Sequence, residues 1–381
     1  MTGVIRVLIA DDSSAVRGVL SKVIAAEPQL ELIGAASNGA IAVEKAARLR
    51  PDVIVLDIEM PVMTGLEAVV EIRKRDTKTP IIMFSTLTEH GADITLEALS
   101  KGASDYAAKP TNTGTAVSSI DQIRQELVTK IIGFGSHAAA PAPARTQVSL
   151  AVNRQSKASS VKALLIGSST GGPAALEKVL TGLTRPLPIP IIIVQHMPAT
   201  FTGVLANRLN SCCSFPVHEA AQGMKIEAGS CYVAAGGHHL KLAATGVNVT
   251  VELDDGPKVK SCRPSVDVMF DSATKAYGGS VLATVLTGMG DDGLDSAGRL
   301  VAKGIDVIVQ DEATSVVWGM PGAIAKAGLA SLCLPLDQIA SAIVKRTSLS
   351  GLGSVARPAP TGTAPRSAAR PTALTSPERR P

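Results

Sequence analysis

The chain has 381 residues, of which 45% are hydrophobic but only 2% aromatic. That length exceeds what one hydrophobic core usually serves, so we expect two domains whose packing rests on Ala, Val, Ile and Leu, as in layered α/β folds. The formal net charge of +4 comes entirely from residues 351–381, which hold five arginines and one acid, so residues 1–350 sum to zero and give no electrostatic indication of a nucleic-acid partner.

The chain has five cysteines at positions without CxxC spacing, which indicates neither a disulfide framework nor a zinc site. Acidic residues occur near the N-terminus before any apolar stretch long enough for a signal peptide, and no run of about 18 apolar residues occurs anywhere. These features predict a cytoplasmic protein without membrane insertion.

In the first third of the chain, short apolar runs alternate with amphipathic stretches of helical period. This alternation predicts a βαβ series with parallel strands. The predicted strands are 5–10, 30–36, 52–57, 80–85 and 104–108.

Three carboxylates fall at strand ends that share one edge of this predicted sheet. Asp11 and Asp12 follow the first strand, and Asp57 ends the third. Such a cluster is costly unless a hard divalent cation such as Mg²⁺ binds it through oxygen ligands. A carboxylate can also accept a phosphoryl group, and Asp57 is the preferred acceptor because the neighbouring pair remains for the metal.

A hydroxyl and an ammonium group are predicted at the same edge. Ser85 and Thr86 end or follow the fourth strand, and Lys109 follows the fifth. Together with Mg²⁺ they would neutralise and hydrogen-bond the oxygens of a phosphoryl group. Each residue alone is more often a helix cap or a solvated charge, so the prediction depends on the whole set.

Residues 4–125 resemble a response-regulator receiver domain on these residues. The resemblance implies that Asp57 is phosphorylated, that Asp11 and Asp12 hold Mg²⁺ with it, and that Lys109 contacts the phosphoryl group. It further implies a switch hydroxyl at Ser85, an aromatic switch at Tyr106 and a metal-binding backbone carbonyl at Glu59.

The periodicity ends near Gly133 and resumes at about Val161. The residues between contain no acidic residue and little periodicity, which predicts a flexible linker. The final stretch has six prolines and few large apolar residues, which predicts disorder. The predicted boundaries are a first domain over 1–130, a linker over 131–160, a second α/β domain over 161–349 and a tail over 350–381.

The second domain opens with a strand, a glycine-bounded turn and a helix. Residues 167–171 read GSSTG, which satisfies the GxSxG nucleophile-elbow pattern with Ser169 at its centre. Backbone N–H groups at the start of a helix stabilise negative charge. A turn of this composition could equally hold a phosphate, so the pattern alone leaves both interpretations open.

A base and an acid for this serine follow later strands. His196 comes directly after the strand predicted at 189–195, whereas His218, His238 and His239 do not follow a long buried strand. The adjacent carboxyl groups of residues 291 and 292 follow the strand predicted at 281–288. The order Ser, His, Asp differs from that of α/β-hydrolases, which place the acid before the histidine.

The segments IGSSTGGP, VQHMP and LTGMGDDG resemble the catalytic domain of CheB chemotaxis methylesterases over residues 161–348. The resemblance implies Ser169 as nucleophile, His196 as base and acid, and Asp292, with Asp291 as its neighbour, as orienting carboxylate. Backbone N–H groups of Thr170 or Met289 are implied as oxyanion donors.

This family hydrolyses glutamate methyl esters on chemoreceptors and deamidates receptor glutamines, without a cofactor for hydrolysis. The implied phosphodonor is the histidine kinase CheA, and the implied location is the cytoplasmic receptor array. We hypothesise that the unphosphorylated first domain covers the face that carries Ser169.

The expected fold class is α/β, with an N-terminal flavodoxin-like (βα)5 receiver domain and a C-terminal doubly wound parallel-sheet hydrolytic domain. A DNA-binding output domain is disfavoured because no helix-turn-helix unit is evident and the body is neutral. The remaining alternative is the same fold acting as a phosphorylation-dependent binding module without catalysis.

Overall fold

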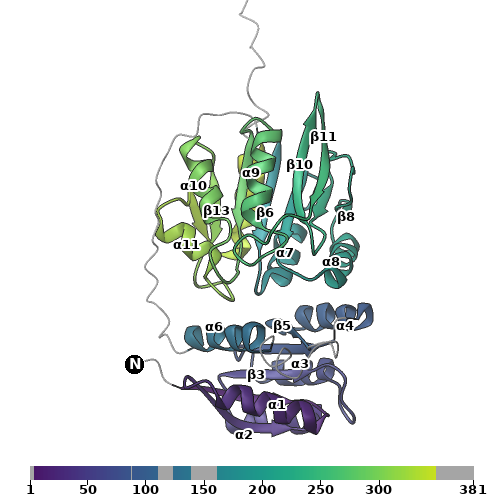
Figure 1. The fold of residues 1–381 in the computed structure, drawn as a ribbon, viewed down its shortest axis with the longest axis vertical. Coiled ribbons are helices and arrows are strands. Elements are labelled where there is room, and N and C mark those ends of the chain that lie inside the picture. Colours follow the sequence, from purple (N-terminus) through teal and green to yellow (C-terminus); the bar gives the residue numbers. More distant parts are fainter. Residues whose placement is uncertain (1–3, 87, 110–122, 139–160, 349–381) are drawn as a thin grey trace, which may run out of the picture.

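A computed structural model describes residues 4–86, 88–109, 123–138 and 161–348. It contains two α/β domains that lie against each other (Figure 1). Within these residues no helix has the length and apolar character needed to cross a membrane. The predicted tail over 350–381 lies outside the described residues.

The N-terminal domain is built on a parallel sheet with strand order β2-β1-β3-β4-β5. Its strands are β1 Ile5–Ala10, β2 Leu30–Ala36, β3 Val53–Asp57, β4 Ile81–Ser85 and β5 Asp105–Ala108. Its first helices are α1 Ser14–Ala25, α2 Gly39–Leu49, α3 Gly65–Arg73 and α4 Glu89–Ser100. The α/β fold expected for this domain is therefore confirmed, because all five predicted strands form and all pair in parallel.

The helical part of this domain extends into the segment for which a linker was predicted. A π-helix, η1 (Arg124–Val128), continues directly into α6 (Thr129–Ala138). Ile131 and Phe134 are buried in the N-terminal core, and Gly135 lies against the side chain of Ile5. The prediction of a flexible chain is thus wrong for 131–138, because apolar burial holds these residues in a helix, while 139–160 lie outside the described residues.

The C-terminal domain has a parallel sheet with strand order β14-β13-β12-β6-β7-β9-β8. The strands are β6 Ala163–Ser168, β7 Ile191–Gln195, β8 Val217–Glu219, β9 Cys231–Val233, β12 Val281–Val285, β13 Val307–Gln310 and β14 Leu332–Leu334. The helices are α7 Gly172–Thr181, α8 Ala199–Cys212, α9 Val266–Ala276, α10 Leu294–Ala302, α11 Met320–Lys326 and α12 Leu336–Ser348.

Three central strands of this sheet are completely buried. In β6, β7 and β12 every residue is buried, as expected for a parallel sheet covered on both faces. The chain runs from β6 to β7 on one side and reaches β12 on the other, so β6 lies where the strand order reverses. The crevice outside the carboxyl ends of strands at such a point is the usual place for a site in an open α/β sheet.

A hairpin stands apart from this sheet. Strands β10 (His239–Thr245) and β11 (Asn248–Asp254) pair antiparallel with each other and form a separate two-stranded sheet. Strand β11 therefore belongs to a hairpin and not to the main sheet. Figure 1 shows this hairpin projecting along α9 and away from the N-terminal domain.

The face of the N-terminal domain formed by α4, β5 and α6 meets the C-terminal domain (Figure 1). Helix α4 packs against α7 and α8. The ring of Tyr106 stacks on the ring of Phe201 in α8, with 4.6 Å between centroids and an interplanar angle of 10°. Helix α6 comes so close to Met289 that a Cβ at Gly133 would lie 2.7 Å from the Met289 methyl group.

Candidate functional site

The turn after β6 carries the predicted nucleophile. Ser169 follows the strand directly, is half-buried, and donates its backbone N–H to the carbonyl oxygen of Thr287 at 3.0 Å. Gly171 adopts a φ of 74°, which favours glycine, and α7 begins one residue later. Gly288 packs so closely on this turn that a Cβ there would lie 2.9 Å from the Cβ of Ser169.

A buried amide connects this turn with the end of the neighbouring strand. Gln195, the last residue of β7, is 1% exposed. Its Oε1 accepts from the Ser168 hydroxyl at 2.7 Å, and its Nε2 donates to the carbonyl oxygens of Ser169 at 2.9 Å and His196 at 3.2 Å. Gln195 therefore ties the backbones of the predicted nucleophile and base together, a role that the sequence analysis missed.

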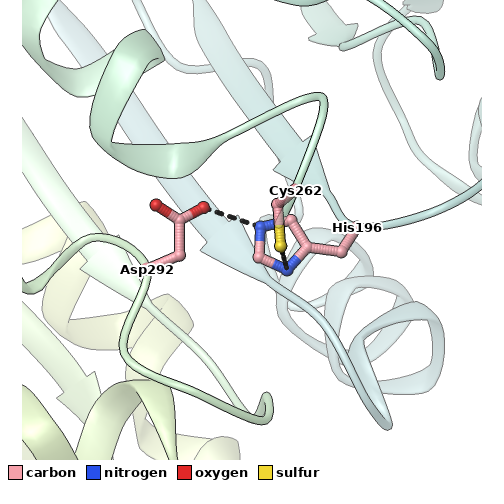
Figure 2. Close-up of side chains that lie close together, drawn as sticks. All are labelled: His196, Cys262 and Asp292. Atoms are coloured by element: carbon pink, nitrogen blue, oxygen red, sulfur yellow. Dashed lines mark hydrogen bonds and ion pairs between the residues drawn. The ribbon is translucent and has the colours of Figure 1, made fainter. Parts of the chain in front are cut away.

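The predicted base and acid are in contact (Figure 2). Nε2 of His196 lies 2.8 Å from Oδ2 of Asp292, whose side chain is almost completely buried. Asp292 also accepts from the Ser265 hydroxyl at 2.9 Å and from the backbone N–H groups of Val266 at 2.7 Å and Asp267 at 3.2 Å. It is thus fixed at the N-terminus of α9, where the backbone N–H groups stabilise a carboxylate.

This contact raises the pKa of His196 and lowers the pKa of Asp292. Burial raises the pKa of Asp292, but the hydrogen bonds from His196 and the α9 backbone outweigh it and hold the pKa at about 2. Burial lowers the pKa of His196, but the hydrogen bond and charge of Asp292, with a contribution from Cys262, raise it to about 9. The pair therefore stabilises an imidazolium, the form that a general base takes after accepting a proton.

The orientation of the imidazole determines which nitrogen can act as the base. Because Nε2 is bound to Asp292, only Nδ1 remains to take a proton from Ser169. In the structure Nδ1 faces Sγ of Cys262 at 3.5 Å, and within the described residues no hydrogen bond joins Ser169 to His196. Catalytic hydrogen bonds commonly form only when substrate is bound. No sequence pattern marked Cys262.

The other histidines of this domain have different partners. His218 packs against the ring of Tyr232, with 5.7 Å between centroids. His238 contacts Asp255, and His239 contacts the carbonyl oxygen of Pro257. The structure therefore places His196, and not its competitors, beside the buried carboxylate.

Two backbone N–H groups beside Ser169 are available. The N–H groups of Thr170 and Met289 make no hydrogen bond to any described residue. Their turns are joined by Thr287, whose hydroxyl contacts the carbonyl oxygens of Thr170 at 3.0 Å and Val317 at 3.2 Å and accepts from the N–H of Val317. A free pair of donors next to a nucleophile is what an oxyanion hole requires.

The predicted phosphoacceptor cluster also forms. Carboxylate oxygens of Asp11, Asp12 and Asp57 lie within 4.8 Å of one another. Nζ of Lys109 lies 2.7 Å from Oδ1 of Asp57 and 2.9 Å from Oδ2 of Asp11. Three oxygen donors, two of them buried, fit a hard cation such as Mg²⁺.

Burial and the neighbouring ammonium oppose each other in this cluster. Burial raises the pKa of Asp57, and although Lys109 lowers it, the pKa remains raised at about 6. For Lys109, burial lowers the pKa, but the hydrogen bonds and charges of the two carboxylates raise it above its usual value. A cation bound at the cluster would favour the ionised form of Asp57.

The remaining predicted residues of this domain lie in different surroundings. Ser85 is buried and its hydroxyl contacts the carbonyl oxygen of Thr86 at 3.1 Å, whereas Thr86 itself is exposed. Glu59 is exposed and its carboxylate is not part of the described cluster. The ring of Tyr106 is buried against Phe201 of the C-terminal domain.

Comparisons with known proteins agree with this organisation. A family model described as CheB methylesterase matches residues 164–343, and one described as response regulator receiver domain matches residues 7–121. A protein-glutamate methylesterase/protein-glutamine glutaminase of Nocardioides sp. is 45% identical over 90% of this chain and 95% of its own length. One of Trichodesmium erythraeum is 42% identical over 90% of this chain and 98% of its own length.

Among solved structures, the Thermotoga maritima CheB methylesterase catalytic domain is 40% identical to this chain. The match covers 49% of this chain and 98% of that chain, with a TM-score of 0.48.

Proposed function

Because the chain belongs to the family of CheB protein-glutamate methylesterases and protein-glutamine glutaminases, we propose that Ser169, His196 and Asp292 carry out its hydrolysis. The substrates are glutamate methyl esters and glutamine side chains of chemoreceptors. Hydrolysis takes place in the cytoplasm at receptor arrays. The observation that carries this proposal is the contact between His196 and the buried Asp292 beside the nucleophile turn.

In the proposed reaction, Oγ of Ser169 attacks the ester carbonyl and gives its proton to Nδ1 of His196. The backbone N–H groups of Thr170 and Met289 donate to the oxyanion of the tetrahedral intermediate. Its collapse breaks the bond to the methoxy group, which leaves as methanol with the proton from His196. A water molecule, deprotonated by the same nitrogen, then hydrolyses the acyl-enzyme.

Glutamine deamidation uses the same steps. The leaving group is ammonia, which takes its proton from His196, and the product is again a glutamate side chain. The chemistry requires only side chains, backbone donors and water, so one site serves both activities.

We further propose that the N-terminal domain is phosphorylated on Asp57 by the histidine kinase CheA. Asp11, Asp12 and Asp57 would hold Mg²⁺, which would supply charge neutralisation for the incoming phosphoryl group. Lys109 holds the Asp57 carboxylate in place, and its ammonium remains available to pair with a phosphoryl oxygen.

Phosphorylation acts through the contact between the domains. Support for this comes from Gly133 of α6, which lies against Met289, and from Val317, which is buried in the same apolar cluster as α6. Since Met289 is a proposed oxyanion donor, the N-terminal domain rests on the catalytic turn itself. Separation of this contact is proposed to open the site to the receptor.

Methanol release from methylated receptor membranes tests the proposal. Wild type and Ser169→Ala are compared, each with and without acetyl phosphate and Mg²⁺. Wild-type release should need Ser169 and rise with the phosphodonor. No release from wild type under either condition would favour the non-catalytic binding module.

A further inference from the structure

We propose that Nδ1 of His196 and Sγ of Cys262 form a binding site for a thiophilic divalent cation of the Zn²⁺ class, and that the bound cation inhibits hydrolysis. Figure 2 shows the sulfur of Cys262 drawn over the imidazole and joined to one ring nitrogen, while the other ring nitrogen is joined to the carboxylate of Asp292. Inhibition rests on the proposed role of His196 as the base, whereas binding does not.

The spacing of the donors fits such a cation. Bonds of about 2.3 Å to sulfur and about 2.0–2.1 Å to nitrogen, at the tetrahedral angle, place the two donor atoms of a zinc site about 3.5 Å apart. Sγ of Cys262 and Nδ1 of His196 are 3.5 Å apart. The separation of the two donor atoms therefore needs no change for a cation to replace the thiol proton.

The imidazole has the orientation of a metal ligand. Its Nε2 is bound to Asp292 at 2.8 Å, so in the neutral ring the lone pair is on Nδ1. Histidines that bind zinc commonly donate their other nitrogen to a carboxylate, which fixes the ring and increases its basicity. Oxygens of Asp292 already accept from four groups, so Asp292 would support His196 and would not leave the α9 backbone to bind the cation.

The thiol is held in position by a tight turn. Val259 and Cys262 exchange backbone hydrogen bonds at 3.1 and 2.8 Å, and the two residues between them have left-handed backbone conformations. Lys260 anchors this turn through the carbonyl oxygen of Asp291 at 3.0 Å and the carboxylate of Asp295 at 3.2 Å. The donor pair is thus preformed, which reduces the cost of binding.

Occupancy of this site would block the reaction directly. Binding releases to solvent the proton of the Cys262 thiol and, from the protonated ring, the proton of Nδ1, and it places the thiolate and the Nδ1 lone pair on the cation. Nδ1 can then no longer accept the proton of Ser169. The soft thiolate ligand distinguishes this site from the cluster of Asp11, Asp12 and Asp57. That cluster offers only carboxylate oxygens, which are hard ligands and suit Mg²⁺.

Cobalt spectroscopy tests binding without any turnover. Co²⁺ is added to the full chain in excess Mg²⁺, and the thiolate-to-cobalt absorption band is recorded for wild type, Cys262→Ala and Cys212→Ala. Cys212 is an exposed thiol and serves as the matched control. Wild type and Cys212→Ala should show the band and Cys262→Ala should not; a wild type without the band, or an undiminished band in Cys262→Ala, overturns the proposal.

Zinc titration of methyl-ester hydrolysis tests the consequence. Each variant is compared with its own metal-free rate, and a chelator should restore the wild-type rate. Loss of one ligand should raise the zinc concentration for half-inhibition by on the order of tenfold or more in Cys262→Ala. Equal sensitivity of wild type and Cys262→Ala contradicts inhibition at this site.

Thermal unfolding without metal verifies that Cys262→Ala is folded. Cys262→Ser replaces it if it is not. Absence of hydrolysis by metal-free wild type would contradict the proposed function alone, because the cobalt band does not depend on turnover.

Discussion

The carboxylate of Asp292 serves two partners at once, the imidazole of His196 and the N-terminus of α9. We expect Asp292→Asn to lower kcat between about 100-fold and 10,000-fold, because the amide stabilises neither the imidazolium nor the required tautomer. The base form of His196 is needed for attack, so wild-type kcat/KM should rise with pH with a midpoint near 9. In Asp292→Asn the hydrogen bond and charge of Asp292 are lost while burial still lowers the pKa of His196, so the midpoint should move to lower pH.

Asp291→Asn is the matched control for this prediction. The side chain of Asp291 is 54% exposed and contacts Lys260 but not His196. The midpoint of the pH dependence of kcat/KM should be the same in Asp291→Asn as in wild type, with both measured in the presence of a chelator. A shift as large as that of Asp292→Asn would contradict the assignment of the acid.

The raised pKa of Asp57 makes a prediction about stability. Because the folded state holds this proton more tightly than the unfolded state, wild type should lose stability as pH rises from about 4 through about 6. Asp57→Asn does not titrate, so its free energy of unfolding relative to wild type should increase between pH 4 and pH 7. Urea unfolding without Mg²⁺ measures this, and the same difference at both pH values would contradict it.

At the residue scale, the sequence predicted that His196 and Asp292 meet but not how they meet. Ser169 and His196 were candidates because each follows a strand of one parallel sheet, and the family resemblance selected Asp292 over the adjacent Asp291. The use of Nε2 by Asp292 depends on ring orientation, which no sequence pattern encodes. Cys262 reaches His196 through a turn far along the chain, so its proximity is a tertiary effect.

At the scale of elements, β6 and α9 approach each other closely at Gly167. A Cβ there would lie 2.6 Å from a methyl group of Val266, the first residue of α9. Gly167→Ala should therefore cost about 1–3 kcal/mol of stability through overpacking. Because α9 also holds Asp292, kcat should fall as well.

Gly18→Ala is the control for Gly167→Ala, and the free energy of unfolding of both variants is measured by chemical denaturation. Gly18 lies in α1, and a Cβ added there would have no atom of the described residues within 4 Å, apart from its own helix and chain neighbours. Alanine there should stabilise the protein by about 0.5–1 kcal/mol, because glycine is unfavourable inside a helix. Equal effects of the two substitutions would show that Val266 moves aside without cost.

Long buried strands were predictable, and the two short edge strands of the C-terminal sheet were not. The central strands are mostly apolar and stand out from their surroundings, whereas β8 and β14 have three residues each and lie at the edges of the sheet. Helix α6 was missed because its sequence, TKIIGFGSHA, contains two glycines that lower helix propensity. Burial of Ile131 and Phe134 overrides that preference.

At the scale of the whole molecule, the stacked pair Tyr106 and Phe201 connects the domains. Such a pair contributes about 0.5–1.5 kcal/mol beyond its buried area, which corresponds to a shift of about two- to twelvefold in an equilibrium. Tyr106→Ala should raise methanol release by unphosphorylated protein by a factor of this order. The phosphodonor should then stimulate it less than wild type.

Tyr106→Phe keeps the ring and should retain the low unphosphorylated rate. Adding Asp57→Asn to Tyr106→Ala should leave the increased rate unchanged, because it does not depend on the phosphoryl group. A double variant that returns to the wild-type rate would show that the ring acts on phosphorylation and not on the contact.

The apolar core also crosses the boundary between the domains. One buried cluster includes Tyr106 with Phe201 and Leu205, and another includes Phe134 with Val317. Two domains that share buried surface unfold cooperatively, so calorimetry of unphosphorylated protein should give a single heat-absorption peak. Acetyl phosphate and Mg²⁺ should divide this peak into two. The width of a melting curve would then directly measure how tightly the N-terminal signalling domain and the C-terminal hydrolytic domain are coupled.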